Sequence, residues 1–290
     1  MEYPVLQQYL SRLRSSLTKS QLWLDEQGRA RGRYFNASLS SVFQPVRDGG
    51  GQVYAYEAYA RSFDSSDQGL HVWRLLEYVA NDEESVELDR LCRLLHAINF
   101  YRQPESRYAD LYLIVHSRLL AAVEGNHGAA FRRILETLEL PHEQIVLQMP
   151  LISPSQRWVL NHVVENYRRN GFRIGVNAAS VAQALDLLER VRPDVIKIDA
   201  ETAIRESGLT ALLEQGLRQN AQVVFRRIER EASWTLLQRL NEEHYPLLTQ
   251  GFLFDLPDAR LARQNHASTL AEHTAGHVAP QAGIVQRAQV

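Results

Sequence analysis

The strongest constraint on the fold is a regular alternation of short apolar runs with longer amphipathic ones. Eight runs have the length and composition of buried strands: Ser41–Pro45, Val53–Arg61, Leu111–Val115, Ile145–Gln148, Arg173–Val176, Val195–Ile198, Val223–Arg226 and Leu247–Leu253. Most are separated by segments with helical periodicity: Val86–Phe100, Ala129–Leu138, Ser155–Asn170, Val181–Val191, Leu209–Gln219 and Ala232–Asn241. This order predicts an α/β fold, a closed TIM-like (β/α)8 barrel. An open doubly wound sheet is the alternative, because periodicity does not show closure.

One connection departs from the regular scheme. Only Val46 to Gln52 separate the first two predicted strands, and this stretch contains three consecutive glycines. It is too short for a crossover helix, so the two strands are expected to pair as an antiparallel hairpin.

The bulk composition limits the class of protein. The chain has 290 residues, of which 45% are hydrophobic, and barrels of about 250 residues are commonly single domains. A net charge of −2 gives no indication of binding to nucleic acid or to a membrane. The sequence shows neither a signal peptide nor an apolar run of about 20 residues. The single cysteine, Cys92, excludes an intrachain disulfide, and a cytoplasmic location is expected.

Both ends are predicted to be additions to the barrel. Residues 1–38 are expected to form an N-terminal extension, with an amphipathic helix over 3–18 and a strand-like segment at Leu22–Leu24. The barrel domain is expected at 39–262, and the polar residues 263–290 as a flexible tail. The extension is expected either to cap the bottom of the barrel or to contact a partner.

Four short motifs lie on the predicted strands, whose carboxyl ends meet at the mouth of a barrel. They are Gln44-Pro45, Tyr56-Glu57-Ala58-Tyr59-Ala60-Arg61, Lys197-Ile198-Asp199 and Gln250-Gly251. In this order, from Leu39 to Leu261, the chain resembles the EAL family of cyclic diguanylate phosphodiesterases. The resemblance implies a barrel with an antiparallel first strand and a mouth where carboxylates hold two divalent cations.

The resemblance also assigns residues to the family's site. Glu57 matches a metal-binding glutamate, and Lys197 matches the catalytic lysine. The other metal positions fall on Ile114, Gln148, Asn177, Ala178 and Arg226. Two of these side chains carry no oxygen, two carry only a neutral amide, and Arg226 is a permanent cation, whereas hard dications need charged oxygen ligands. From this pattern we expect a pseudoenzyme: not an enzyme, with no metal or cofactor, and with Glu57 and Lys197 as relics.

The charged residues of the mouth are expected to pair with one another. Arg226 is predicted to reach Glu57 or Glu229. Glu57 and Lys197 are alternatively expected to persist as partners of each other. Candidate ligand-binding residues are Gln44, Arg61, Lys197, Asp199, Glu229 and Gln250.

Three functions follow from these expectations. The leading hypothesis is a non-catalytic EAL-like regulatory protein that acts in bacterial signalling through an unidentified protein partner. The alternative is a receptor that binds cyclic diguanylate weakly without hydrolysis, which Arg61 and Lys197 favour and Tyr59 and Leu151 oppose. A weak phosphodiesterase is the third. No nucleic-acid or membrane partner is expected, and a homodimer is compatible with the sequence.

Overall fold

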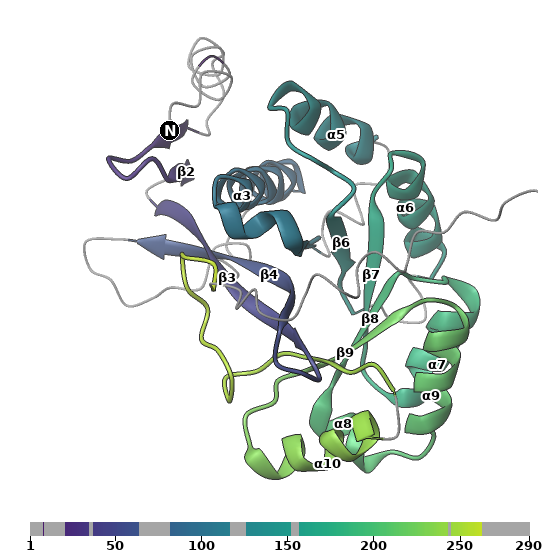
Figure 1. The fold of residues 1–290 in the computed structure, drawn as a ribbon. Coiled ribbons are helices and arrows are strands. Elements are labelled where there is room, and N and C mark those ends of the chain that lie inside the picture. Colours follow the sequence, from purple (N-terminus) through teal and green to yellow (C-terminus); the bar gives the residue numbers. More distant parts are fainter. Residues whose placement is uncertain are drawn as a thin grey trace, which may run out of the picture.

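The strands form a closed barrel. The computed structural model describes residues 8, 21–34, 37–63, 82–116, 126–151, 157–242 and 245–262. Its barrel strands are β3 (Ala37–Asp48), β4 (Val53–Phe63), β5 (Asp110–Ile114), β6 (Ile145–Met149), β7 (Arg173–Ala178), β8 (Val195–Asp199), β9 (Gln222–Arg226) and β10 (Leu248–Thr249) (Figure 1). The ring closes because β3 pairs with both β4 and β10. The predicted TIM-like barrel is therefore confirmed, and the open sheet is excluded.

The first barrel strand runs against the others, as the short glycine-rich connection predicted. β3 is antiparallel to β4 and β10, whereas the remaining neighbours pair in parallel. In the turn, the carboxylate of Asp48 accepts hydrogen bonds from the backbone N–H groups of Gly50 (3.0 Å) and Gln52 (2.8 Å). Gly51 has a φ of 80°, a conformation that a side chain would strain.

Helices cover the outside of the barrel. They are α3 (Asp82–Tyr101), α5 (His127–Thr137), α6 (Arg157–Arg169), α7 (Val181–Arg190), α8 (Ala200–Arg205), α9 (Leu209–Arg218) and α10 (Glu231–Glu242), with a 3₁₀ turn η1 at Pro104–Tyr108. The six predicted helices are present with small shifts at their ends, whereas α8 and η1 were not predicted. Local signals set some boundaries: Ser180 caps the start of α7 by accepting from the Gln183 N–H, and Gly171 follows α6 with a φ of 81°.

The apolar core has a layer inside the barrel and a layer outside it. The inner cluster consists of Val46, Ala55, Tyr112, Val146, Val195, Val224 and Leu248. A larger cluster fills the space between the strands and the helices. The barrel interior is therefore filled by packed side chains, and a site at the mouth lies above this packed layer.

The N-terminal extension adds a hairpin beside the barrel mouth. β1 (Gln21–Leu24) pairs with β2 (Ala30–Tyr34), and β2 pairs with Ala37–Leu39 of β3. That part of β3 also pairs with Ser62 and Phe63 at the carboxyl end of β4, so the hairpin lies at the mouth end. The expectation that it caps the barrel bottom is therefore wrong for this hairpin.

The hairpin is held by packing against α3. Leu22 is buried in a cluster with Leu91 and Leu95. Partner binding by this segment would require Leu22 to be exposed, and it is not. Gly32 permits the approach, because a Cβ at Gly32 would lie 2.9 Å from Cδ1 of Leu95. The predicted helix over 3–18, apart from residue 8, and the tail 263–290 lie outside the described residues. Among the helices that the structure describes, none is long and apolar enough to cross a membrane.

Candidate functional site

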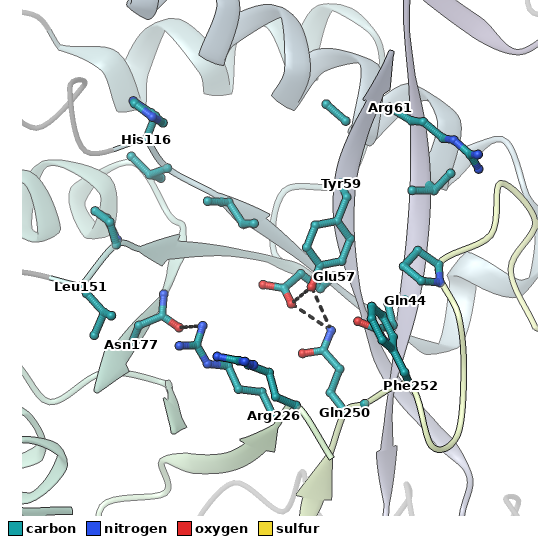
Figure 2. Close-up of a pocket in the computed structure, with 18 of the residues that line it drawn as sticks. Gln44, Glu57, Tyr59, Arg61, His116, Leu151, Asn177, Arg226, Gln250 and Phe252 are labelled. Carbon is teal, nitrogen blue, oxygen red and sulfur yellow. Dashed lines mark hydrogen bonds between the residues drawn. The ribbon is translucent and has the colours of Figure 1, made fainter. Parts of the chain in front are cut away.

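A cavity of about 880 Å³ opens at the mouth of the barrel (Figure 2). Both its buried and its exposed lining residues include polar and apolar side chains. Its lining comprises Val42, Gln44, Glu57, Tyr59, Ala60, Arg61, Ile114, Val115, His116, Pro150, Leu151, Asn177, Arg226, Arg227, Glu229, Gln250, Gly251, Phe252 and Pro257. The residues come from β3, β4, β5, β7 and β9 and from the segments that follow β5, β6, β9 and β10, as expected for a barrel mouth.

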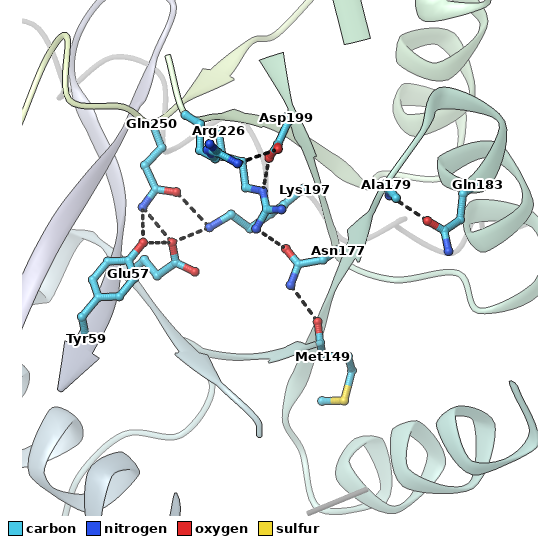
Figure 3. Close-up of polar contacts among 11 residues, drawn as sticks. Glu57, Tyr59, Met149, Asn177, Ala179, Gln183, Lys197, Asp199, Arg226 and Gln250 are labelled. Atoms are coloured by element: carbon cyan, nitrogen blue, oxygen red, sulfur yellow. Dashed lines mark hydrogen bonds and ion pairs between the residues drawn. The ribbon is translucent and has the colours of Figure 1, made fainter. Parts of the chain in front are cut away.

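One oxygen of Glu57 is the centre of a buried hydrogen-bond network (Figure 3). The Glu57 Oε2 accepts from Lys197 Nζ at 2.7 Å, from the Tyr59 hydroxyl at 2.5 Å and from Gln250 Nε2 at 2.8 Å. Lys197 Nζ also donates to Gln250 Oε1 at 2.9 Å. The expectation that Glu57 and Lys197 pair with each other is confirmed, and Gln250 supports both.

The network fixes the charges of this pair. Burial alone raises the pKa of Glu57, but the Lys197 ammonium and the three hydrogen bonds outweigh burial and bring the pKa below its usual value. Full burial lowers the pKa of Lys197, and Arg226 adds to this effect while Glu57 opposes it. Burial, followed by the charge of Glu57, holds the pKa of Tyr59 well above its ordinary range, so the hydroxyl remains a donor.

Arg226 pairs with an acid that the sequence analysis did not assign to it. Its Nε donates to Asp199 Oδ1 at 2.6 Å, and its Nη1 lies 3.4 Å from the Asn177 side-chain oxygen. The prediction that Arg226 reaches Glu57 or Glu229 is therefore wrong. The reason is register: Asp199 ends β8 directly beside Arg226 at the end of β9.

Arg227 brings a second guanidinium to the rim. Its Nη1 lies 3.3 Å from Asp199 Oδ2, so Asp199 bridges two arginines. Arg227 has a φ of 59°, which is uncommon for a residue with a side chain and turns the chain sharply after β9. Residues held in such conformations are enriched at functional sites. Sequence reasoning missed Arg227, because nothing in the sequence shows the turn.

The five positions that the family resemblance assigned to metal ligands, apart from Glu57, do not share one environment. Ile114, Asn177 and Arg226 line the cavity. Gln148 lies fully buried in β6, and neither atom of its amide has a hydrogen-bond partner within the described part of the chain. Ala178 faces outward and belongs to the core between the strands and the helices.

The candidate ligand-binding residues are also divided. Gln44 lines the cavity, but its Nε2 donates to the Asp255 carbonyl at 2.9 Å and so holds the final segment. Arg61 is exposed and extends away from Glu57 and Arg226 in Figure 2. Glu229 lies exposed on the rim, whereas Lys197 and Asp199 do not line the cavity. Their roles in ligand binding remain predictions.

Phe252 is a rim residue that sequence reasoning also missed. It is 59% exposed, although it is a large aromatic residue. Gly251 places it there, because a Cβ on Gly251 would lie 2.0 Å from the Ile228 carbonyl oxygen. The signal was present in the Gln250-Gly251 motif, since a glycine required by close backbone approach fixes the direction of the next residue.

The side chains of the mouth do not fit a pair of divalent cations. The described residues contain no group of three or more His, Cys, Asp or Glu side chains placed to hold a metal ion. Glu57 Oε2 is occupied by Lys197, Tyr59 and Gln250, and the Arg226 guanidinium adds positive charge. Hard dications need several oxygen ligands with compensating negative charge. We therefore derive no chemical step through a metal.

Comparison with protein families identifies the chain. The EAL domain model matches residues 30–257, which is most of the sequence. The chain belongs to the EAL family. A search of curated proteins gives no match.

Solved EAL-domain structures share the fold. The Klebsiella pneumoniae BlrP1 manganese and cyclic diguanylate complex is 19% identical with a TM-score of 0.62, over 76% of this chain and 56% of that chain. Bacillus subtilis YkuI, in complex with substrate cyclic diguanylate and calcium, is 19% identical with a TM-score of 0.62, over 79% of this chain and 58% of that chain. The PaMucR phosphodiesterase complex with cyclic diguanylate is 18% identical with a TM-score of 0.59, over 76% and 92%. The matched region of this EAL domain therefore spans little more than half the length of BlrP1 and YkuI.

These comparisons correct one expectation. The expectation that the chain is not an enzyme is wrong, because the chain is an EAL domain related to cyclic diguanylate phosphodiesterases and has the fold of the PaMucR phosphodiesterase.

Proposed function

We propose that the mouth of this EAL domain binds cyclic diguanylate. The observation that carries the proposal is a cavity of about 880 Å³ with three arginines, Arg61, Arg226 and Arg227, in its lining. Small-molecule sites in proteins have volumes of about 300–1,000 Å³. Cyclic diguanylate carries two phosphodiester groups, and the guanidinium fork of arginine suits phosphate oxygens.

Arg226 is the best-placed phosphate contact. Asp199 holds its Nε, and Asn177 lies beside its Nη1, so the guanidinium is oriented before a ligand arrives. Its side chain is 27% exposed, and Nη2 has no hydrogen-bond partner among the described residues. A fixed donor loses little side-chain entropy on binding, which favours affinity.

The negative charge of Glu57 does not oppose a phosphate strongly. Lys197 lies 2.7 Å below the carboxylate, and Gln250 and Tyr59 donate to the same oxygen. The floor of the cavity is therefore close to neutral, while the arginines lie above it on the walls and rim.

The rim offers apolar surface for the guanine bases. Phe252 is 59% exposed and Leu151 is 49% exposed, and both line the cavity. Stacking of a base on an aromatic side chain contributes about 1–3 kcal/mol in nucleic-acid sites. A ligand that carries both phosphates and planar bases matches this combination of arginines and apolar residues.

Calorimetric titration with cyclic diguanylate, in magnesium and separately in EDTA, tests the proposal. We expect a dissociation constant near 1 μM, worth about −8 kcal/mol. Arg226→Gln should weaken binding about 10- to 100-fold, since a hydrogen bond to a charged group is worth about 1.5–3 kcal/mol. Arg218→Gln is the matched control, because Arg218 is exposed on α9 and pairs with Glu214 there.

Two results would overturn the assignment: no binding heat in either buffer, or an Arg226→Gln variant that binds as tightly as the parent protein. Linear product should be quantified in the same samples by chromatography, so that binding and hydrolysis are measured on one preparation.

A protein partner is the second candidate. Leu256 is 70% exposed and lies in the same final segment as Phe252, so two large apolar side chains face solvent close together in the chain. A contiguous exposed apolar patch marks a contact surface, and these two residues are the candidates for one in this segment. A partner that uses them should be captured from native extract by the parent protein and lost with Leu256→Glu. Capture of the same partner by both proteins would contradict this role. The cytoplasmic location and the homodimer remain predictions.

A further inference from the structure

A second cavity lies beside the barrel and shares no lining residue with the mouth. It has a volume of about 600 Å³ and forms where the β1–β2 hairpin, the end of α3, the start of β3 and the segment after β10 meet. Its lining is Gln27, Arg29, Ser40, Ser41, Asn99, Arg102, Gln103, Asp258, Ala259 and Arg260. Ala259 is the only apolar residue in that lining, and three of the ten residues are arginines.

The floor of this cavity is polar and rigid. Asn99 accepts from the Ala30 N–H at 2.8 Å and donates to the Ala30 carbonyl at 2.9 Å, which ties the hairpin to α3. The Ser41 hydroxyl lies 2.8 Å from His96 Nδ1 and 3.3 Å from Asn99 Nδ2. Ser40 and Ser41 are both buried. A site whose polar groups are already fixed binds ligands at a lower entropic cost.

The walls are fixed as well. Gln103 accepts from the Leu261 N–H at 2.9 Å and donates to the Asn99 and Ala259 carbonyls at 2.9 and 3.2 Å. Arg102 donates to the Gln27 carbonyl at 2.9 Å. One glutamine and one arginine thus join the end of α3 to the hairpin and to the segment after β10.

The charge of the lining favours an anion. The lining contains three arginines, Arg29, Arg102 and Arg260, and one acid, Asp258. Outside the lining, the Asp25 carboxylate accepts from the Nε of Arg29 at 2.9 Å. Arg29 uses its backbone N–H and its Nε for Asp25, and Arg260 uses only its backbone N–H for Asp258, so the terminal guanidinium nitrogens of both have no partner among the described residues. The carboxyl end of a helix disfavours anions because its last carbonyl groups carry partial negative charge. In α3 these carbonyls accept hydrogen bonds from the backbone N–H groups of Arg102 and Gln103 and from the Gln103 side chain, which offsets that charge.

We propose that this cavity binds a small phosphate-bearing molecule, with Arg29 and Arg260 as the phosphate contacts and Asn99, Ser40 and Ser41 as the polar floor. Arginine forks match phosphate oxygens bidentately. Nine of the ten lining residues are polar or charged, which favours a ligand whose remainder carries hydroxyl groups. The site holds the hairpin and the final segment together, so a bound ligand stabilises that junction.

Titration with inorganic phosphate and with glycerol 3-phosphate tests the proposal, at constant ionic strength set with sodium chloride. Binding is followed by calorimetry and by the shift in unfolding temperature. The proposal expects glycerol 3-phosphate to bind more tightly than phosphate. Arg260→Gln and Arg29→Gln should each weaken binding of glycerol 3-phosphate at least about ten-fold, which is about 1.4 kcal/mol.

Two controls separate this cavity from other sites. Arg218→Gln removes an exposed arginine on α9 and should leave binding of glycerol 3-phosphate unchanged. Arg226→Gln removes the mouth arginine and shows whether glycerol 3-phosphate binds in the mouth instead. If Arg226→Gln abolishes binding and Arg260→Gln does not, the anion binds in the mouth and the proposal is wrong. Equal binding by all four variants would show only non-specific anion binding and would also overturn it. Circular dichroism confirms that Arg29→Gln and Arg260→Gln are folded, which is expected because both side chains reach solvent.

Discussion

Acidification from pH 7 to pH 5 should destabilise this EAL domain through one histidine. His96 lies in the middle of α3, is buried, and places its Nδ1 2.8 Å from the Ser41 hydroxyl. Burial lowers its pKa to about 3, because the charged imidazolium would lose its hydration in the folded state. In the unfolded chain the same side chain has a pKa of about 6.5.

The sign and size of the effect follow from these two values. Below pH 6.5 the unfolded state takes up a proton that the folded state does not bind, so the free energy of unfolding falls as the pH falls. Each pH unit in this window costs about 1.4 kcal/mol, and the loss from pH 7 to pH 5 is about 2 kcal/mol. Carboxylates contribute little in this window, because most of them protonate below pH 5 in the unfolded chain.

Urea unfolding at pH 7, 6 and 5 measures this loss. His96→Asn keeps a polar atom near the position of Nδ1 and cannot take up a proton, so its unfolding free energy should vary about 2 kcal/mol less across the window. His162→Asn is the control, because it removes a histidine that is exposed on α6 and not buried. A His96→Asn protein with the same pH dependence as the parent would refute the assignment of the effect to His96.

Three further substitutions test the fold around the site by urea unfolding. Asp89→Asn should cost about 3–5 kcal/mol, because Asp89 and Arg93 form a buried ion pair at 2.7 Å; a loss below about 1 kcal/mol would contradict this. Gly251→Ala should cost about 2 kcal/mol or more, since the new Cβ would lie 2.0 Å from a backbone oxygen, and an unchanged midpoint would refute the required close approach. Tyr59→Phe should cost about 1–2 kcal/mol through the lost hydrogen bond to Glu57, and equal stability would show that the bond contributes nothing.

The barrel strands could be predicted because their burial on both faces leaves apolar runs in the sequence. β6, for example, is buried at every position, including Gln148. β10 shows the limit of this approach: the apolar run suggested Leu247–Leu253, whereas the strand covers only Leu248–Thr249. The ladder stops there because Gln250 turns into the mouth network and Gly251 contacts the Ile228 backbone.

The elements that the sequence did not predict are either very short or have few large apolar side chains at their buried positions. β2 has the sequence Ala30-Arg31-Gly32-Arg33-Tyr34, in which the buried positions are alanine, glycine and tyrosine. Glycine in such a run suggests a turn, but Gly32 is there to let Leu91 and Leu95 approach the strand. α8 has six residues and directly follows β8, too short a segment for helical periodicity to be visible.

The site could be predicted as a set of positions but not as a set of contacts. The motif residues did gather at the mouth, and the Glu57–Lys197 pair was foreseen as one of two arrangements. The partner of Arg226 was not foreseen, since it depends on the register between β8 and β9. A shift of one residue in that register would have turned Asp199 away from Arg226.

The charges of the mouth are arranged in two levels, and this arrangement bears on both candidate functions. At the lower level, the buried charge of Glu57 is matched by Lys197, as a buried ion must be to avoid a large desolvation cost. At the upper level, Asp199 is shared by Arg226 and Arg227, so one acid offsets two cations. The excess positive charge therefore lies where a ligand enters and not in the floor. A phosphate meets that charge first, and an apolar partner segment must pass it to reach the interior. We therefore expect the rim to select the ligand, while the Glu57–Lys197 pair keeps the floor in place.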